Sequence, residues 1–226
     1  MGKTKAGPKG SFSVFIVDDH ALIRQGLRQL IGNEPDMVVC GEAETGPEAV
    51  RGISSLKPSV VTVDISLRDS NGLDLVKQLH DLVPSLPIVV LSMHDEAYYA
   101  ERVLRSGASA YVMKDEPPET IVAAIRKALA GELRVSPRMS ARLLSKVVGR
   151  SGRETPEAVD GLSDREIEVL ELIGRGHGTR KIALTLHISV KTVEAHRENI
   201  KRKLSLSDAN DLVQYAVRWV LQGHPA

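Results

Sequence analysis

The stretch SVFIVDDHALIRQGLRQLIG, residues 13–32, contains one complete unit of the predicted fold. Its first part, residues 13–17, is apolar and rich in β-branched side chains, as in a strand buried on both faces of a parallel sheet. Two aspartates follow, and apolar residues then recur at helical spacing from Leu22 to Ile31, just before the stop signal Gly32. The stretch therefore predicts a strand, an acidic turn and a helix.

The same unit recurs through roughly the first 130 residues. Four further short apolar runs follow the first: residues 37–40, 60–64, 88–91 and 110–113. Segments with helical spacing lie between and after them, and the last ends where Gly131 supplies a stop signal. Five strands alternating with five helices predict an α/β domain with a doubly wound, five-stranded parallel sheet of the flavodoxin-like type.

The rest of the chain has a different pattern. Residues 134–148 fit one more short helix, whereas residues 149–160 hold glycines, a proline and mixed charges, as in a linker. From residue 161 the pattern is all-helical, with Ser163 and Glu166 at capping-box spacing before the first of four helices. The expected parts are a flexible tail (1–11), the α/β domain (12–131), a linker (132–160) and a small all-α four-helix domain (161–226).

Composition excludes several classes of protein. Apolar residues make up 42% and charged residues 26% of the 226 residues, which excludes a mainly disordered chain. Cys40 is the single cysteine, so an internal disulfide framework is excluded and a reducing compartment fits. No apolar run approaches the roughly 18 residues of a membrane span, and the start of the chain lacks the apolar segment of a secretory signal. These features predict a cytoplasmic protein with no membrane partner.

The net charge of +1 hides an asymmetry between the two halves. Residues 11–133 carry 11 basic and 18 acidic side chains, a balance of −7, whereas residues 134–226 carry 16 and 11, a balance of +5. An acidic part joined to a basic part indicates two domains with different partners. A cation or metal suits the first domain, and an anionic polymer suits the second.

Polar side chains stand at the carboxyl ends of the predicted strands. Asp18 and Asp19 follow the first strand, Asp64 ends the third, and Ser92 and Lys114 stand at the ends of the fourth and fifth. Ligands of open α/β sheets bind beyond these ends, so these groups are expected to converge. Clustered carboxylates repel one another unless a hard cation joins them, and Mg²⁺ prefers carboxylate oxygens. A single acid at a loop end is usually only solvated, but five matched side chains at the ends of four strands predict a Mg²⁺ site at which one aspartate accepts a phosphoryl group.

Four motifs together resemble the receiver domain of two-component response regulators: FIVDDH (15–20), VVTVDISLRDSNGLDL (60–75), PIVVLSMHD (87–95) and GASAYVMKD (107–115). The resemblance covers about residues 12–131 and implies phosphoryl transfer from a sensor histidine kinase. It implies that Asp64 is the phosphoacceptor and that Asp18, Asp19 and the Ser66 carbonyl surround Mg²⁺ with it. It further implies that Lys114 and Ser92 bind the phosphoryl oxygens, and that Ser92 and Tyr111 form a hydroxyl–aromatic switch.

The chain departs from the receiver pattern at a few positions. Leu67 and Arg68 stand where many receivers have Met-Pro, Met93 stands where a small residue is common, and Asp115 stands where proline is frequent. None of these departures removes a chemical group, so phosphorylation is still expected. Met93 and Arg68 are expected to tune its rate and the lifetime of the phosphoryl group.

The third helix of the C-terminal domain, opening at Ser189, has the character of a DNA-reading helix. Val193, Ile200 and Leu204 share one face, and the opposite face carries small, polar and basic groups, which can lie in a major groove. The start of the preceding helix favours a phosphate. From charge alone, a helical bundle with a solvated face remains the alternative. The candidate DNA contacts are Thr179, Arg180, Lys181, Lys191, Thr192, Glu194, Ala195, Arg197, Glu198, Lys201 and Arg202.

A second resemblance covers LSDREIEVLELIGRGHGTRKIALTLHISVKTVEAHRENIKRKLSL (162–206), which is similar to a LuxR-type helix-turn-helix nearly throughout. A receiver followed by this module is the layout of the NarL/FixJ family. The resemblance implies a phosphorylation-dependent transcriptional regulator that binds double-stranded promoter DNA, and small modules of this kind act as homodimers on paired half-sites. It implies no enzyme beyond slow self-phosphorylation from small donors and autodephosphorylation. Many relatives have a basic residue where Glu194 stands, so Glu194 bears on which sequence is read.

Two alternatives stay open at this point. A phosphatase with a phospho-aspartyl intermediate usually has a second Asp two residues after its nucleophile, where this chain has Ser66. A receiver with vestigial phosphorylation would be regulated through protein contacts alone. The seven histidines show no metal-ligand spacing, and Cys40, within a predicted strand, is expected to be a small core residue.

Overall fold

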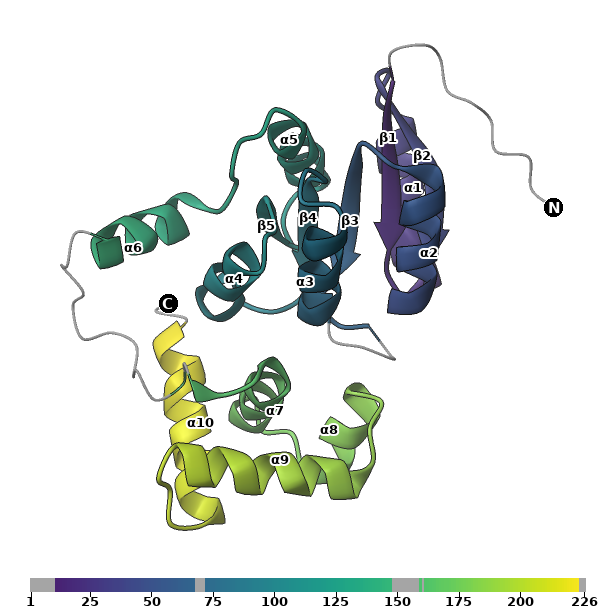
Figure 1. The fold of residues 1–226 in the computed structure, drawn as a ribbon. Coiled ribbons are helices and arrows are strands. Elements are labelled where there is room, and N and C mark those ends of the chain that lie inside the picture. The colour runs from purple at the N-terminus through teal and green to yellow at the C-terminus, as the bar shows by residue number, and fades with distance from the viewer. Residues whose placement is uncertain (1–10, 68–71, 148–158, 160, 224–226) are drawn as a thin grey trace. The chain divides into compact units, whose positions relative to one another are not determined.

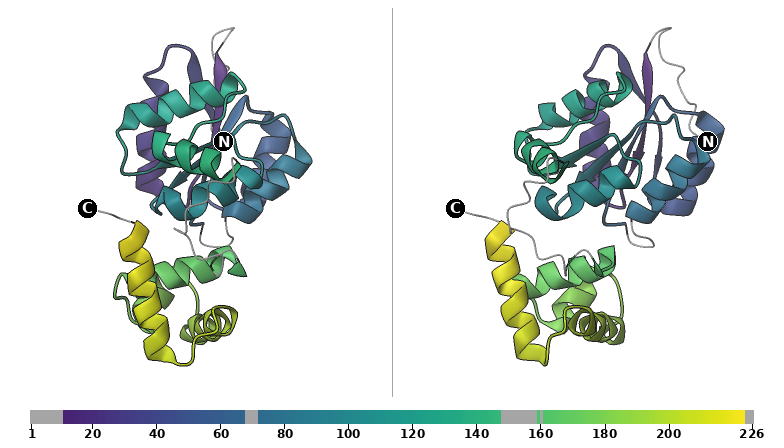
Figure 2. Two further views of the ribbon diagram at one scale, coloured as in Figure 1. Left: turned by 90° about the vertical axis from the view of Figure 1, so that its left-hand side faces the viewer. Right: turned by 60° about the vertical axis from the view of Figure 1, so that its left-hand side comes forward.

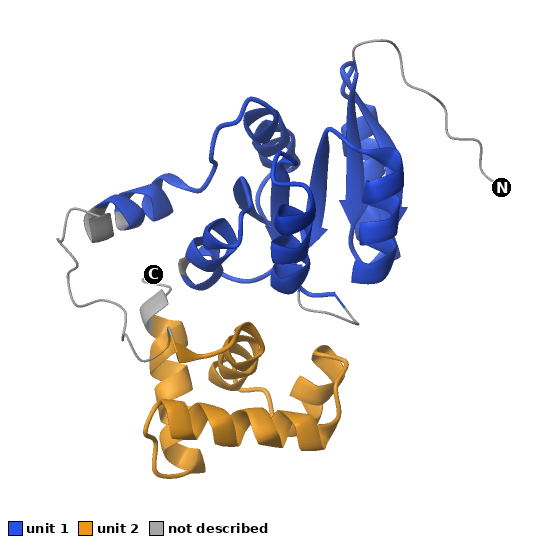
Figure 3. Ribbon diagram, in the orientation of Figure 1, with its two compact units in different colours: residues 1–144 blue, residues 145–226 orange. Residues whose placement is uncertain are grey.

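The computed structural model describes residues 11–67, 72–147, 159 and 161–223. The chain divides into two compact units, residues 1–144 and residues 145–226 (Figure 3). The α/β part lies in the first unit and the four C-terminal helices lie in the second. Nearly all of the expected tail, and the part of the expected linker from residue 148 to 158, fall outside the described residues.

The first unit is built on a five-stranded parallel sheet in the order β2-β1-β3-β4-β5 (Figure 1). This topology confirms the predicted doubly wound fold. The strands are β1 (Phe12–Val17), β2 (Met37–Ala43), β3 (Val60–Asp64), β4 (Ile88–Ser92) and β5 (Ala110–Met113). The alternating helices are α1 (Ala21–Gly32), α2 (Gly46–Leu56), α3 (Gly72–Leu82), α4 (Glu96–Arg105) and α5 (Pro118–Leu129).

Helices cover both faces of the sheet, as the turned views in Figure 2 show. On one face α1 packs against α5, and on the other α2 contacts α3 and α3 contacts α4. Every residue of β3 and of β4 is buried. Burial on both faces explains why these strands are continuously apolar in the sequence rather than alternating.

The edge strand β2 differs from the inner strands. Its Cys40 is half-buried, and the thiol donates a hydrogen bond to the Val14 carbonyl oxygen (3.4 Å). The expectation that Cys40 lies in the core is therefore wrong. The reason is topological, because β2 has β1 as its single neighbour in the sheet and is less covered than an inner strand.

The winding of the sheet changes direction between β1 and β3. The chain leaves β1 for β2 on one side and returns to β3 on the other side. In open α/β sheets, ligands bind beyond the carboxyl ends of the strands at such a switch point. Asp18 directly follows β1 and Asp64 is the last residue of β3, so the fold places both at this point.

The first unit continues past α5 as a segment that runs beside β5. Arg134 forms an isolated parallel β-bridge with Ala110. The chain then enters α6 (Pro137–Val147), at the place where a short helix was expected within residues 134–148.

The second unit consists of α7 (Asp164–Gly174), α8 (Thr179–Thr185), α9 (Val190–Lys203) and α10 (Ala209–Gly223). The predicted capping box is present, since Ser163 accepts from the Glu166 backbone N–H and Glu166 accepts from that of Ser163. α7 packs against α9 and α10, and Val193, Ile200 and Leu212 are fully buried. Among the described residues, no helix is long and apolar enough to span a membrane.

Candidate functional site

Three buried carboxylates gather at the switch point of the first unit. Asp18, Asp19 and Asp64 are 1%, 6% and 3% exposed, although all three stand at strand ends where acids are usually solvated. One ligand atom from each of these residues and from His20 lies within 4.8 Å of the others. The predicted convergence of the carboxylates is therefore present in the fold.

Lys114 joins two of these acids. Its ammonium lies 2.7 Å from Asp18 Oδ2 and 2.8 Å from Asp64 Oδ2, and its side chain is only 7% exposed. The position follows from β5, because Lys114 comes directly after that strand and its backbone N–H donates to the Ser92 carbonyl at the end of β4 (2.7 Å). Lys114 supplies one positive charge to three carboxylates, which leaves an excess of negative charge when all three are ionised.

The pKa values of Asp64 and Lys114 reflect both burial and the neighbouring charges. Burial raises the pKa of the Asp64 carboxyl; the Lys114 ammonium opposes this rise and the Asp18 carboxylate adds to it. Burial alone would lower the pKa of Lys114, but the carboxylates of Asp64 and Asp18 outweigh that effect and raise it. Lys114 is therefore charged at neutral pH and can hold an anionic group beside Asp64.

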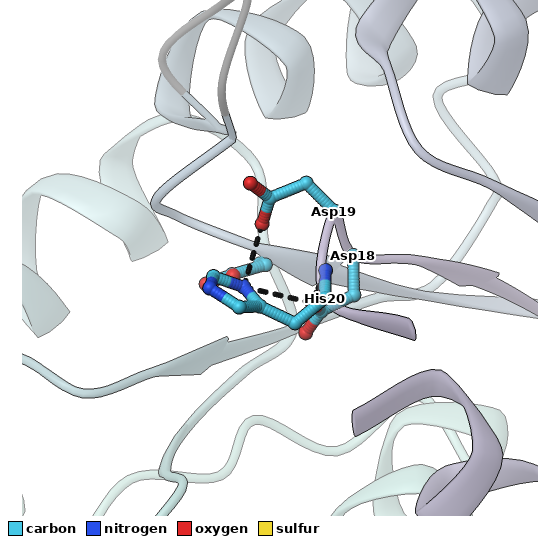
Figure 4. Close-up of side chains that lie close together, drawn as sticks. Asp18, Asp19 and His20 are labelled. Carbon is cyan, nitrogen blue, oxygen red and sulfur yellow. Dashed lines mark hydrogen bonds and ion pairs between the residues drawn. The ribbon is translucent and has the colours of Figure 1, made fainter. Parts of the chain in front are cut away.

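His20 is a member of the cluster that the sequence reasoning missed. Its Nδ1 lies 2.8 Å from Asp19 Oδ1 and 3.5 Å from Asp18 Oδ1, and its backbone N–H donates to Asp18 Oδ1 (2.8 Å) (Figure 4). His20 shows no metal-ligand spacing in the sequence, because it reaches the carboxylates by adjacency in the chain rather than by a helical spacing. The available signal was its place in the FIVDDH motif.

The loop after β3 fixes the Asp64 side chain. The Ser66 backbone N–H donates to Asp64 Oδ1 (3.1 Å), which orients one carboxylate oxygen. Where α3 begins, the Gly72 N–H donates to the Ile65 carbonyl (2.8 Å), and a Cβ at position 72 would lie 2.2 Å from the Asp64 carbonyl oxygen. Glycine at position 72 therefore allows α3 to start against the end of β3.

The predicted switch residues both contact the backbone of His94. Ser92 is fully buried and its Oγ accepts from the His94 N–H (3.0 Å), while the buried Tyr111 hydroxyl donates to the His94 carbonyl (2.7 Å). The His94 ring stacks on Tyr99 with centroids 4.7 Å apart, and its Nε2 lies 3.1 Å from Ser66 Oγ. His94 thus connects Ser66 in the loop after β3 with Ser92 and Tyr111, a role that no sequence pattern indicated.

The departures from the receiver pattern fall in different environments. Leu67 is buried, so its side chain takes an interior position where many receivers have methionine. Met93 is 64% exposed and Asp115 is exposed, so neither side chain belongs to the core. Arg68 lies outside the described residues.

In the second unit, α9 presents the predicted DNA-facing side chains to solvent. Lys191, Thr192, Glu194, Ala195, Glu198 and Arg202 are exposed, and Arg197 and Lys201 are half-buried. The helix is capped by Ser189, whose Oγ accepts from the Thr192 N–H (3.0 Å). Arg180 and Lys181 are exposed and Thr179 is half-buried at the start of α8.

Local pairs modify the charge of the α9 face. Lys201 Nζ lies 2.8 Å from Glu198 Oε1, and Arg202 donates to the Asn199 side chain (3.0 Å). Lys203 contacts the buried Glu166 of α7 (2.7 Å) and so supports the bundle. Lys201, Arg202 and Lys203 therefore contact neighbouring polar groups within their own unit, which a helical wheel alone did not indicate.

Comparison with known families assigns both units. Residues 14–126 match the family described as response regulator receiver domain, and residues 160–216 match the family of bacterial regulatory proteins of the luxR type. The chain is 37% identical over 209 residues to the oxygen regulatory protein NreC of Staphylococcus aureus (strain JH9), covering 91% of this chain and 96% of that protein.

Solved structures of similar proteins include assemblies with DNA. RcsB of Salmonella enterica serovar Typhimurium, bound to the promoter rprA in the presence of the phosphomimetic BeF₃⁻, is 26% identical with a TM-score of 0.60, covering 92% of this chain and 98% of that one. A structure of two RcsB dimers bound to two parallel DNAs is also 26% identical, with a TM-score of 0.55 and coverage of 93% and 99%.

Proposed function

Because the chain belongs to the response regulators of the NarL/FixJ type, which join a receiver domain to a LuxR-type DNA-binding domain, we propose that Asp64 accepts the phosphoryl group that controls its DNA binding. The observation that carries this assignment is the buried Asp18–Lys114–Asp64 arrangement at the switch point, with 2.7 and 2.8 Å contacts. A structural ion pair would not need the further buried acid Asp19 beside it.

The cluster fits Mg²⁺ by the chemistry of its donors. Asp18, Asp19, Asp64 and the Ser66 carbonyl would hold the ion, since hard oxygen ligands suit Mg²⁺ and the acids exceed the single charge of Lys114. When bound, the ion would neutralise charge between the phosphoryl oxygens and the carboxylates. His20 contacts Asp19 and so helps to fix the orientation of that carboxylate.

The proposed reaction uses Asp64 as a nucleophile. One carboxylate oxygen forms a bond to phosphorus as the bond from phosphorus to the imidazole nitrogen of the sensor kinase breaks, and the imidazole leaves. Lys114, released from part of its contact with Asp64, would pair with a phosphoryl oxygen, and the Ser92 hydroxyl would donate to another. Loss of the Ser92 contact with His94 would alter the support of Tyr111, because both bond to the same residue.

The test is labelling with Mg²⁺ and acetyl phosphate. We expect an acyl phosphate on the parent protein that is stable in acid and labile in base, none on Asp64→Asn, and weaker labelling on Asp19→Asn. Asp74→Asn, which changes an exposed aspartate in α3, serves as the matched control and should label like the parent. Full labelling of Asp64→Asn would overturn the assignment.

We propose that α9 reads the major groove and that the start of α8 holds a phosphate. The exposure of Lys191, Glu194 and Ala195, with Val193 buried beneath them, supports this orientation. We propose that the double-stranded target is promoter DNA and that the protein acts in the cytoplasm.

We further propose that the DNA-bound form is a homodimer. Val213, Val217 and Leu221 are 40%, 37% and 66% exposed and recur every four residues along α10, so they form an apolar stripe outside the bundle core. Half-sites about one helical turn apart would match such a dimer. A DNase footprint confined to one half-site at saturating protein would argue against it.

The proposed domain limits are residues 12–131 for the receiver and 161–226 for the DNA-binding domain, with 132–160 as linker. Support comes from the family matches at 14–126 and 160–216.

We propose no enzymatic role beyond slow self-phosphorylation from small donors and autodephosphorylation. A phosphatase would need a second acid where Ser66 stands, and a vestigial receiver would not label at Asp64.

A further inference from the structure

Ser136 stands between the segment beside β5 and helix α6, and two contacts hold it. Its hydroxyl accepts from the Met139 N–H (3.1 Å), so Ser136 caps the N-terminus of α6, with Pro137 at the first helical position. Its own backbone N–H donates to Glu96 Oε1 (2.7 Å). Glu96 is the first residue of α4. The Glu96 carboxylate on α4 therefore binds Ser136, the residue that caps α6.

A second anchor holds the same segment on β5. The Arg134 N–H donates to the Ser109 carbonyl (2.9 Å), and the Tyr111 N–H donates to the Arg134 carbonyl (3.0 Å). The Arg134 guanidinium lies 3.9 Å from Glu116 Oε2, and the buried Met139 side chain closes the far end. Residues 133–139, here termed the strap, are thus bonded to the backbone of the proposed switch residue Tyr111.

The two anchors differ in how they connect to the phosphorylation site. The β5 anchor is an isolated β-bridge, in which backbone hydrogen bonds hold Arg134 against the edge strand β5. The Glu96 anchor follows residues 93–95, and His94 in that loop donates to Ser92 and accepts from the Tyr111 hydroxyl. If the Ser92 hydroxyl turns to a phosphoryl oxygen, the His94 N–H loses its acceptor, two residues before Glu96.

We propose that the Glu96–Ser136 hydrogen bond is a clasp that phosphorylation opens, an inference that rests on the proposed phosphorylation of Asp64. In the resting protein the clasp holds the start of α6 on α4. A shift of the loop after Ser92 withdraws the Glu96 carboxylate from the Ser136 N–H. The β5 anchor keeps the strap attached, so the change is confined to the orientation and fraying of α6.

The physical consequence for α6 follows from helix-end chemistry. An acceptor and a negative charge at a helix N-terminus satisfy free N–H groups and favour the helix dipole. Opening the clasp removes both from Ser136, the cap residue directly before α6. Helix α6 begins the connection to the DNA-binding domain. Opening of the clasp would therefore be the first change in that connection that phosphorylation of the receiver causes.

Hydrogen exchange of the full-length protein tests the clasp directly. With Mg²⁺ and beryllofluoride as the probe, we expect peptides covering residues 133–140 of the parent to exchange at least tenfold faster than without it. Glu96→Ala should exchange fast in both states, and Glu96→Gln, which keeps an acceptor without the charge, should lie between. Glu119→Ala is the matched control, since it removes an exposed first-turn acid of the neighbouring helix α5.

DNA binding gives the second readout. Glu96→Ala should take up label at Asp64 within twofold of the parent rate, while the effect of phosphorylation on its DNA affinity falls from at least fivefold to below twofold. Unchanged exchange at residues 133–140 when beryllofluoride binds the parent, or parent-like exchange in Glu96→Ala, would overturn the clasp. Failure of the parent to label at Asp64 would instead overturn the proposed function. The Glu96–Ser136 contact of the resting protein would still be tested, because exchange at residues 133–140 should be slow in the parent and fast in Glu96→Ala.

Discussion

Phe15 shows at the scale of a residue how closely the first unit is packed. Its ring is 2% exposed and lies between β2 and α2, where both neighbouring positions are glycine. A Cβ at Gly41 would lie 2.6 Å from Phe15 Cε2, and one at Gly52 would lie 2.6 Å from Cζ. The ring is therefore confined from two sides and cannot move away from an added methyl group without a shift of the strand or helix.

The two mid-helix glycines Gly26 and Gly52 make a matched test. A Cβ at Gly26 in α1 would meet nothing within 4 Å, so Gly26→Ala should raise the free energy of unfolding by about 0.5–1 kcal/mol through helix propensity. Gly52→Ala should instead lower it by about 1–3 kcal/mol, because overpacking against Phe15 outweighs the propensity gain. Urea denaturation of the two variants measures both. Equal stabilisation by the two substitutions would show that the Phe15 ring is not confined.

Residue-level contacts were the least predictable part of the site. The carboxylates, Ser92 and Lys114 were predicted because each ends or directly follows a strand, and parallel strands end at one edge. His20 and His94 were missed because their contacts depend on the conformation of short loops, which carries no periodic signal. Both histidines nevertheless lie inside motifs that the sequence reasoning quoted.

At the scale of elements, Glu166 joins the start of α7 to the end of α9. It accepts from the Ser163 N–H and from Lys203 Nζ, both at 2.7 Å, and is 3% exposed. Burial alone would raise the pKa of Glu166, but the hydrogen bonds from Lys203 and Ser163 outweigh it and lower the pKa. The ionised form therefore stabilises the folded bundle.

This lowered pKa predicts a pH-dependent effect on stability. The contribution is fully present above the unfolded pKa, near the ordinary value of 4.5, and is lost as the pH falls through the lower folded value. Glu166→Gln should destabilise residues 155–226 by about 1 kcal/mol at pH 7, and the difference from the parent should shrink below pH 4.5. Denaturant titrations at several pH values measure it, with the exposed Glu194→Gln as control. A difference that is constant with pH would contradict the role of the charge.

A second prediction at this scale concerns DNA binding by helix α9. Lys201→Ala should weaken binding of residues 155–226 to all DNA sequences about equally and reduce the salt slope by about one, because one phosphate contact is lost. Glu194→Ala should change which sequences are selected from a random pool. Binding titrations at a series of salt concentrations, with selection, separate the two effects. Absence of any DNA binding by this fragment at low salt would contradict the assignment of the module.

At the scale of the whole molecule, the fold class and both domain types could be predicted from the sequence. The buried parallel strands produce continuous apolar runs, and the capping box at Ser163 marks the start of the helical bundle. The strap, residues 133–139, could not be predicted, because it has no strand pattern and its Arg134 pairs with β5 only through tertiary context. The half-buried position of Cys40 likewise depends on strand order, which no local pattern contains.

The charge asymmetry offers a physical basis for coupling between the domains. We expect the acidic receiver to compete with DNA for the basic side chains of the DNA-binding domain. Coupling between sites is typically about 1–3 kcal/mol, or roughly 5–150-fold in affinity. In this scheme the Ser92→Ala variant should be phosphorylated at Asp64, and yet its DNA affinity should change less on phosphorylation than that of the parent.

The most direct test of the account is the DNA affinity of the full chain, measured on one selected sequence with and without phosphorylation at Asp64. We predict a change of at least fivefold in the parent that is absent in Asp64→Asn, is reduced in Ser92→Ala, and is lost when residues 1–150 are removed. A change below twofold in a parent protein whose Asp64 is demonstrably phosphorylated would contradict the claim that this site controls DNA binding.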